Sequence, residues 1–256
     1  MEMLILFAAA CGAGAMNSVA GGGTIITFPA LIAFGMPAIQ ANATSTLALL
    51  VGIGGSLYGY RGHLHATRRW MGKFAPVSIG GGLLGAWLLT RTDAKVFDHL
   101  VPFLIFFATV LFLLGDAFRR LSGFEGSASE KSGRAYTAGA IVLQFGVAVY
   151  GGYFGAGIGI LMLASLGLLG LKHIHEMNAI KTVLGALINL VAAAYFVCAG
   201  IVVWPQAAVM ALGAAAGYYL GSSFAQRITQ RQVRRLVGFI GILISLIFFW
   251  RQFVSP

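Results

Sequence analysis

The chain contains an internal duplication, because its first half falls on its second half after a shift of 136 positions. The matches cluster on glycine and small polar residues: Gly21, Gly23, Asn42, Ala43 and Thr46 fall on Gly157, Gly159, Asn178, Ala179 and Thr182. Later matches include Gly81, Gly85, Arg91 and Phe112, which fall on Gly217, Gly221, Arg227 and Phe248. Such a pattern predicts a fold of two repeats, and repeats within apolar chains are typical of secondary transporters.

Composition places this duplication in a membrane. Of the 256 residues, 59% are hydrophobic and 9% are charged, and the mean hydropathy is +0.88. A soluble domain has about 25% charged residues. The 36 glycines suit helices that pack closely in lipid. We therefore expect an all-α, polytopic membrane protein.

The formal net charge of +10 does not indicate a nucleic-acid partner, because the basic residues lie in short loops between apolar stretches, where they set topology. Cys11 and Cys198 each lie within an apolar stretch, which predicts neither a disulfide framework nor a metal site. We expect no cofactor. The start of the chain also lacks the basic region of a cleaved signal peptide.

The apolar stretches cover residues 3–35, 41–60, 74–90 and 99–118, and then 137–171, 177–203, 205–225 and 236–250. A membrane-spanning helix needs about 20 residues, so the first stretch of each half is too long for one crossing. Glycines interrupt both long stretches, at Gly21–Gly23 and at Gly155–Gly159. The predicted units are a first repeat (1–118), a polar cytoplasmic linker (119–136) and a second repeat (137–256).

Basic residues distinguish two topologies. If each long stretch crosses once, nine basic residues face seven across the membrane, which orients nothing. If each turns back at its glycines, only Arg91, Lys95 and Arg251 lie opposite the other thirteen loop residues, which are Arg61, Arg68, Arg69, Lys73, Arg119, Arg120, Lys131, Arg134, Lys172, Arg227, Arg231, Arg234 and Arg235. The second arrangement follows the positive-inside rule. It predicts two inverted repeats, each a glycine-broken hairpin followed by three transmembrane helices, with both termini facing away from the cytoplasm.

The glycine breaks predict an anion site. A helix that restarts after a break directs unpaired N–H groups and a positive dipole end into the adjacent cavity. Two inverted breaks would direct two such ends at one point near the membrane midplane. This assigns to the site the residues Gly21, Gly22, Gly23, Thr24, Gly157 and Gly159. The alternative is that these glycines only allow close helix packing.

A second shared element follows each break, at Asn42–Thr46 and at Asn178–Thr182. Its amides and hydroxyls could donate to an oxyanion, or could cap the following helix. Ser45 corresponds to Lys181, and a cation within an apolar stretch is costly and indicates function. Alternatively, Lys181 snorkels to the interface or pairs with Glu176. The residues added to the predicted site are Asn42, Thr44, Ser45, Asn178, Lys181 and Thr182.

The positions of the titratable residues argue against a cation transporter and against a membrane enzyme. His173, His175 and Glu176 could gate transport or couple it to protons, or could lie in an interfacial loop. None of the seven acids lies at the centre of an apolar stretch, which disfavours a cation transporter and a membrane enzyme with paired carboxylates or a metal: Glu2, Asp93, Asp98, Asp116, Glu125, Glu130 and Glu176. The chain also lacks a phosphate-binding loop of the Gly-x-x-x-x-Gly-Lys-Ser/Thr kind, so a gradient or a partner must drive transport.

The run Gly14–Pro29, followed by Gly35 and Asn42–Ser45, resembles the TauE/SafE family of sulfite exporter–like permeases. The resemblance extends over the whole chain, with Gly155–Gly159 and Ala179–Thr182 as the second copy. It implies transport of sulfite, a sulfonate or another small sulfur-containing or organic anion across the cytoplasmic membrane.

The second copy departs from the family pattern. It has Ile180-Lys181 in place of Thr44-Ser45, and Ser165 corresponds to Pro29. The two halves of the predicted site are therefore not chemically equivalent. Alternating access would come from one repeat rocking against the other or from local gating. The alternatives to a permease are an anion channel and a non-transporting assembly subunit, and the sequence is compatible with a homo-oligomer.

Overall fold

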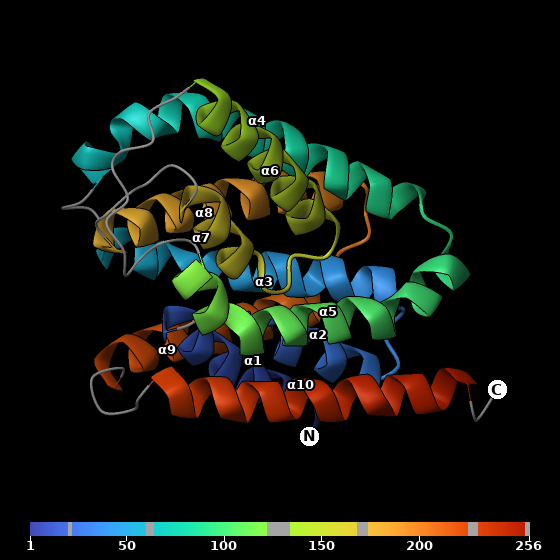
Figure 1. Cartoon of the computed structure of the whole chain (residues 1–256). Coiled ribbons are helices and arrows are strands. Elements are labelled where there is room, and N and C mark those ends of the chain that lie inside the picture. The colour runs from blue at the N-terminus through green and yellow to red at the C-terminus, as the bar shows by residue number, and fades with distance from the viewer. Residues whose placement is uncertain (20–21, 60–63, 122–133, 168–173, 225–229, 254–256) are drawn as a thin grey trace.

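The computed structural model describes residues 1–19, 22–59, 64–121, 134–167, 174–224 and 230–253. Within these ranges the regular structure is entirely helical, which confirms the all-α prediction (Figure 1). The helices of the first half are α1 (Glu2–Val19), α2 (Thr24–Ala33), α3 (Ala38–Gly59), α4 (Leu64–Arg91) and α5 (Ala94–Leu121). Those of the second half are α6 (Arg134–Tyr153), α7 (Ile158–Gly167), α8 (Ile174–Cys198), α9 (Trp204–Phe224) and α10 (Gln230–Phe253).

Each half begins with a long helix, continues with a 10-residue helix and ends with three long helices. The long apolar stretch 3–35 therefore contains α1 and α2, and the stretch 137–171 contains α6 and α7. Gly22, Gly155 and Gly157 lie between these helices with φ values of 91°, 82° and 77°. Only glycine adopts such angles without strain, so these residues suit an interruption of the helix.

Glycine also ends two other helices. After α2, the N–H of Met36 donates to the carbonyl of Leu31 and the N–H of Gly35 donates to that of Ile32. Gly35 has a φ of 81°. This is the hydrogen-bond pattern of a Schellman motif, which satisfies carbonyl groups at a helix end. The same pattern ends α8 at Gly200, which has a φ of 69°.

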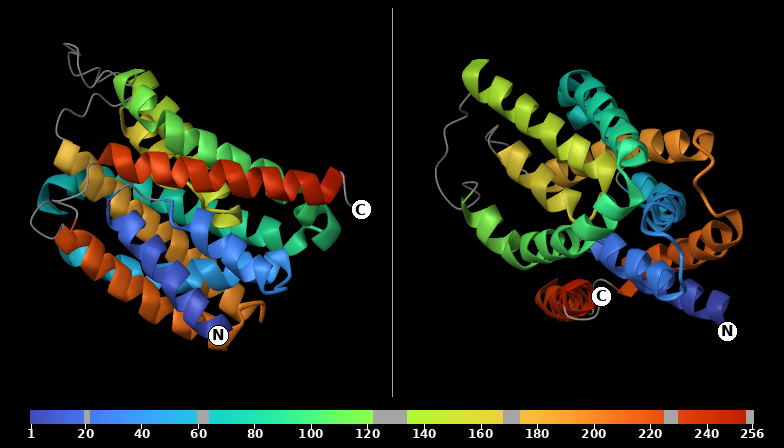
Figure 2. Two further views of the ribbon diagram at one scale, coloured as in Figure 1. Left: turned by 90° about the horizontal axis from the view of Figure 1, so that it is seen from below. Right: turned by 90° about the vertical axis from the view of Figure 1, so that its right-hand side faces the viewer.

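The two halves are interleaved. Helix α1 packs along α9, and α6 packs along α4, so the first helix of each half lies against the fourth helix of the other (Figures 1 and 2). Helices α3 and α8 contact each other, and each also packs on one of those pairs, α3 on α9 and α8 on α4. Helices α5 and α10 form a further pair at the side of the molecule.

Repeated glycines allow the closest of these contacts. A Cβ atom at Gly217 of α9 would lie 1.9 Å from the carbonyl oxygen of Cys11 in α1. A Cβ atom at Gly85 of α4 would lie 2.0 Å from the carbonyl oxygen of Val149 in α6. Small residues at such positions let helix backbones approach closely in lipid. The repeated pairs Gly81/Gly217 and Gly85/Gly221 therefore have a packing role.

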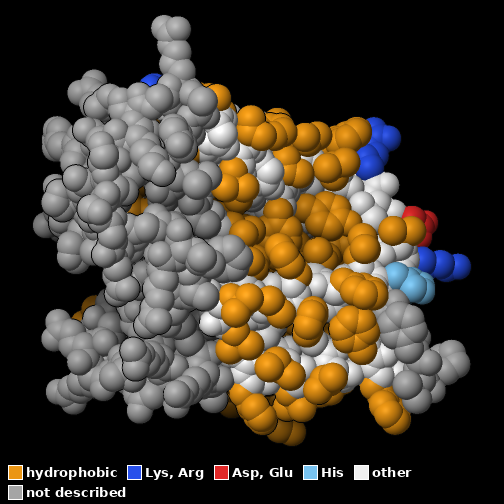
Figure 3. Space-filling view, viewed as in Figure 1, with side chains coloured by type: hydrophobic (Ala, Val, Ile, Leu, Met, Phe, Trp, Pro, Cys, Tyr) orange, Lys and Arg blue, Asp and Glu red, His pale blue; other side chains and the backbone are white. Residues whose placement is uncertain are grey.

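Large hydrophobic side chains are exposed on the described surface of the molecule. Figure 3 shows hydrophobic side chains across the described part of one face, with most of the visible charged side chains and the histidine at the right-hand edge. Arg91, Asp93, Lys95 and Asp98 are exposed where α4 is followed by α5. By length and apolar composition, two described segments are able to cross a bilayer, Ala94–Leu111 and Met177–Cys198, and shorter apolar helices accompany them.

Candidate functional site

At the first break, between α1 and α2, a side chain of α1 accepts a hydrogen bond from the backbone. The N–H of Gly23, which precedes the first residue of α2, donates to Oδ1 of Asn17 over 2.6 Å. The side chain of Asn17 is also hydrogen-bonded to that of Tyr218 in α9. A backbone donor that we predicted to face an anion is thus bound by a side chain of the same half. Thr24 is the first residue of α2, and Gly21 lies outside the described residues.

The second break brings two predicted site residues together. Gly159 lies in the first turn of α7, and Lys181 lies in α8. A Cβ atom at Gly159 would lie 3.4 Å from Cδ of Lys181 and 4.0 Å from its Cε. The aliphatic stem of Lys181 therefore packs over the start of α7, and the side chain is partly buried there. Because a helix N-terminus carries partial positive charge, this end of α7 and the lysine together make a basic region.

Asn42 joins the two halves of the sequence. Its Nδ2 donates to the carbonyl of Tyr153, the last residue of α6, over 2.9 Å. Since that carbonyl only accepts, the Nδ2 group must face it, and the orientation of the amide is fixed. The other atom of the amide, Oδ1, is buried and has no hydrogen-bond partner among the described residues. Asn42 therefore satisfies a carbonyl at a broken helix end in the other repeat.

The hydroxyl groups of the first shared element also connect helices. The hydroxyl of Ser45 lies 2.6 Å from that of Thr27 in α2, and both residues are fully buried. Oγ1 of Thr44 accepts a hydrogen bond from the N–H of Val203, just before α9, over 3.1 Å. Thr44 and Ser45 lie inside α3, so they do not cap that helix.

The matching threonines behave alike. Thr46 donates to the carbonyl of Asn42, and Thr182 donates to the carbonyl of Asn178, each over 2.8 Å within its own helix. The two shared elements lie on α3 and α8, which are in contact. His173 lies outside the described residues, and so do the side chains of His175 and Glu176, whose backbones begin α8.

A buried polar cluster was not predicted from the sequence. Nε2 of Gln144 in α6 donates to Oγ of Ser78 in α4, and Oγ of Ser165 in α7 donates to Oε1 of Gln144, each over 3.0 Å. All three residues are fully buried. The signal in the sequence was a glutamine within an apolar stretch. These hydrogen bonds hold α7 against α6 and α4. They therefore also fix the position of the start of α7, on which the stem of Lys181 packs.

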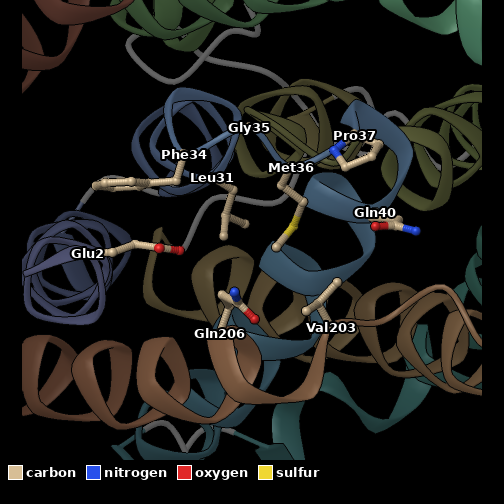
Figure 4. Close-up of a pocket in the computed structure, with 9 residues that line it drawn as sticks. All are labelled: Glu2, Leu31, Phe34, Gly35, Met36, Pro37, Gln40, Val203 and Gln206. Carbon is tan, nitrogen blue, oxygen red and sulfur yellow. The ribbon is translucent and has the colours of Figure 1, made fainter.

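A cavity of about 200 Å³ is lined by residues other than those predicted for the site (Figure 4). Its lining comes from the start of α1, the turn between α2 and α3, and the start of α9, and includes Glu2, Gln40 and Gln206. Figure 4 shows the carboxylate of Glu2 directed into it. A carboxylate repels anions, so we do not include this cavity in the predicted anion site.

Comparison with known proteins bears on the identity of the chain. The family described as "Sulfite exporter TauE/SafE" matches residues 6–248. A probable membrane transporter protein, ORF9, from a Sinorhizobium species is 28% identical over 250 residues, which cover 95% of this chain and 91% of that protein. A probable membrane transporter protein of Haemophilus influenzae is also 28% identical, with 95% and 92% covered.

The probable membrane transporter protein YfcA of Escherichia coli K12 is 28% identical over 249 residues, which cover 94% of this chain and 87% of that protein. No solved structure gives a significant match. Because the family match extends over nearly the whole chain and the relatives are covered almost end to end, the chain belongs to the sulfite exporter TauE/SafE family and is a helical membrane transporter.

Proposed function

We propose that this transporter is a secondary permease for a small anion, with two inverted repeats in the cytoplasmic membrane. The substrate class is sulfite, a sulfonate or a related sulfur-containing or organic anion. The observation that carries the proposal is the placement of Lys181 over Gly159, at the start of a helix that begins within the apolar interior.

Two features support inverted repeats with re-entrant hairpins. The helix contacts exchange between the halves: α1 on α9 corresponds to α6 on α4, and α3 on α9 corresponds to α8 on α4. A two-fold relation between the repeats would produce this exchange. Helices α2 and α7 have 10 residues each, and thus a length of about 15 Å, half the thickness of the hydrocarbon core. A helix of that length with one end at a membrane surface would have its other end near the midplane.

The second break is the stronger candidate for holding the anion. At the first break, the residue that corresponds to Lys181 is the neutral Ser45, whose hydroxyl is hydrogen-bonded to that of Thr27. At the second break, the residue that corresponds to Ser45 is Lys181, whose ammonium group attracts an anion that also faces the N-terminus of α7. We therefore propose an asymmetric site in which Lys181, Gly157 and Gly159 bind the anion. Gly22, Thr24, Asn178 and the first-half hydroxyls would complete the path.

Counterflow in proteoliposomes tests this function. Vesicles preloaded with sulfite, thiosulfate, a small sulfonate or a small carboxylate are diluted into a trace of the same labelled anion, with protein-free vesicles as the control. A permease accumulates label transiently and the rate saturates. Flux that saturates weakly and shows no counterflow would indicate an anion channel. If no anion in the panel exchanges, the proposed substrate class is wrong.

A further inference from the structure

Building on the proposed function, we infer that the anion passes along the contact between α3 and α8, and that the two bodies that move there each contain helices from both halves of the sequence. The first bundle is α1, α2, α3 and α9. The second bundle is α4, α6, α7 and α8. The contact between α3 and α8 is called the seam below.

Helix contacts separate these bundles. Within the first bundle, α1 packs on α2, α3 and α9, and α3 packs on α2 and α9. Within the second, α6 packs on α4, α7 and α8, and α8 packs on α4 and α7. Apart from helices α5 and α10, the extensive contact between the bundles in the described part of the chain is α3 on α8. Figure 1 shows the second bundle above the first, and the end-on view in Figure 2 separates them in the same way.

Glycine contacts lock each bundle internally. In the first bundle, Cβ atoms at Gly213 and Gly217 would lie 2.4 and 1.9 Å from the carbonyl oxygens of Phe7 and Cys11. In the second bundle, a Cβ atom at Gly152 would lie 2.0 Å from the carbonyl oxygen of Gly82. Backbones that approach this closely interdigitate, so sliding one helix along the other would bring carbonyl groups and side chains into collision.

The seam has a different character. Among the glycines whose surroundings the structure describes, none makes such an approach between α3 and α8. Among the described residues, the links between the bundles at the end of α6 are a hydrogen bond from Asn42 to the carbonyl of Tyr153 and an edge-to-face contact of the rings of Phe28 and Phe154, 5.3 Å apart. One hydrogen bond and one ring contact can be broken and remade more easily than an interlocked helix pair. Separation there would also allow water to reach Oδ1 of Asn42, which has no hydrogen-bond partner in the described part of the chain.

The core agrees with this division. One cluster of buried apolar side chains belongs entirely to the second bundle, and includes Phe74, Val147, Met162 and Leu184. The other cluster is centred on the first bundle and continues onto α5 and across the seam. Because α1 is locked to α9 and α6 to α4, the two halves of the sequence cannot separate as rigid bodies. This inference therefore departs from the expectation that one repeat rocks against the other.

The seam would carry the substrate because both shared elements lie on the helices that form it. Ser45 belongs to α3, where its hydroxyl is bonded to that of Thr27 in α2, and Lys181 belongs to α8, where its stem packs on the start of α7. Movement of one bundle along the other would shift Lys181, Gly159 and the start of α7 together relative to α3, since those three elements belong to one bundle. The anion site would then move with the second bundle.

Distances between spin labels in lipid nanodiscs test the assignment of the moving bodies. The native cysteines are first removed by Cys11→Ala and Cys198→Ser. Cysteines for the labels are then introduced in pairs at four exposed positions. In the first bundle these are Leu4 of the first half and Leu220 of the second half, and in the second bundle they are Leu88 of the first half and Val142 of the second half. Distance distributions are recorded by double electron–electron resonance, without anion and with saturating sulfite.

We expect narrow, unchanged distributions for the pairs 4–220 and 88–142, which lie within bundles but join the two halves. The pairs 4–88 and 142–220, which lie within halves but join the bundles, should be broader or shift by several ångströms between conditions. The reverse result would make the sequence halves the moving bodies and overturn the inference. Four equally narrow and unchanged distributions would also overturn it.

The proposed function fails separately from this inference. If no anion of the counterflow panel exchanges, the substrate class is wrong, yet the widths of the four anion-free distributions still decide which helices move together. If exchange is measured and the within-bundle pairs change as much as the others, the transporter functions but the bundles do not exist as rigid bodies.

Discussion

At the scale of single residues, position 181 decides the charge of the predicted site. Its lysine lies in α8, with the side chain packed over the start of α7. Most other described basic side chains lie near helix ends, as Arg91 and Lys95 do. A hydrogen bond in which one partner is charged contributes about 1.5–3 kcal/mol. In a binding site, this corresponds to a change of about 10- to 150-fold in affinity.

We expect Lys181→Ala to lower the uptake of sulfite at subsaturating concentration by at least about tenfold, because the cation that offsets the anion's desolvation is lost. Lys181→Arg should keep part of the activity. Initial rates in proteoliposomes measure both. Lys73→Ala is the matched control, since Lys73 is exposed on α4, with its ammonium group 5.9 Å from the ring centre of Trp70. Unchanged uptake in Lys181→Ala would remove this lysine from the site.

The buried Gln144 cluster leads to a second prediction at this scale. Gln144→Leu removes both side-chain hydrogen bonds and leaves the hydroxyl of Ser78 buried without its donor. We expect a loss of about 1–3 kcal/mol in the free energy of unfolding, measured by denaturant titration in detergent. Ser165→Ala should cost less, because the bond between Gln144 and Ser78 remains. Equal losses in the two variants would contradict this ranking.

At the scale of helices, glycine spacing distinguishes packed faces from open ones. Gly85 and Gly80 both lie in α4, but a Cβ atom at Gly80 would have no neighbour within 4 Å. We expect Gly85→Ala to lower the free energy of unfolding by about 1–3 kcal/mol through overpacking against α6. Gly80→Ala should be neutral or slightly stabilising, because alanine loses less chain entropy.

Thermal unfolding of the two variants, side by side with the parent protein in one detergent, checks that prediction. Gly217→Ala provides the equivalent test for the contact between α9 and α1. Equal stability of the Gly80 and Gly85 variants would mean that α4 and α6 do not approach as closely as described.

Helix boundaries were the least predictable feature at this scale. Helix α4 begins at Leu64, ten residues before the apolar stretch 74–90 from which it was predicted. Helix α5 begins at Ala94, whereas the corresponding apolar stretch begins at residue 99. Hydropathy marks only the part of a helix that lies in lipid, whereas the backbone hydrogen bonds continue through the charged ends. The glycine interruptions were visible in advance because an apolar stretch of more than 30 residues exceeds one crossing.

At the scale of the whole molecule, the distribution of basic residues predicts the orientation in the membrane. We expect Lys95→Cys, in a Cys11→Ala/Cys198→Ser background, to react with a membrane-impermeant maleimide in intact cells, because the inverted arrangement that we propose would place the α4–α5 junction away from the cytoplasm. Arg231→Cys, which corresponds to Lys95 in the second half, should react only after the membrane is permeabilised, because an odd number of crossings per half would place it on the cytoplasmic side. Labelling of both sites in intact cells would contradict the odd number of crossings per half.

Local properties of the sequence determined the helical class, the membrane setting, the duplication and the family. Hydrophobicity, charge and glycine content act along the chain, so a single sequence shows them directly. The asymmetry between Ser45 and Lys181 was visible in the same way, since the shift of 136 positions aligns them.

Only the tertiary structure decided which groups bind one another across long separations. Asn17 accepts a hydrogen bond from the N–H of Gly23, and Asn42 donates one to the carbonyl of Tyr153 in the other half. The aliphatic stem of Lys181 packs on Gly159. The packing of α1 on α9 and of α4 on α6 could not be predicted from the sequence either. These choices depend on the steric fit of helix faces that are distant in sequence. A repeat pattern gives the composition of each face but not the face it will meet.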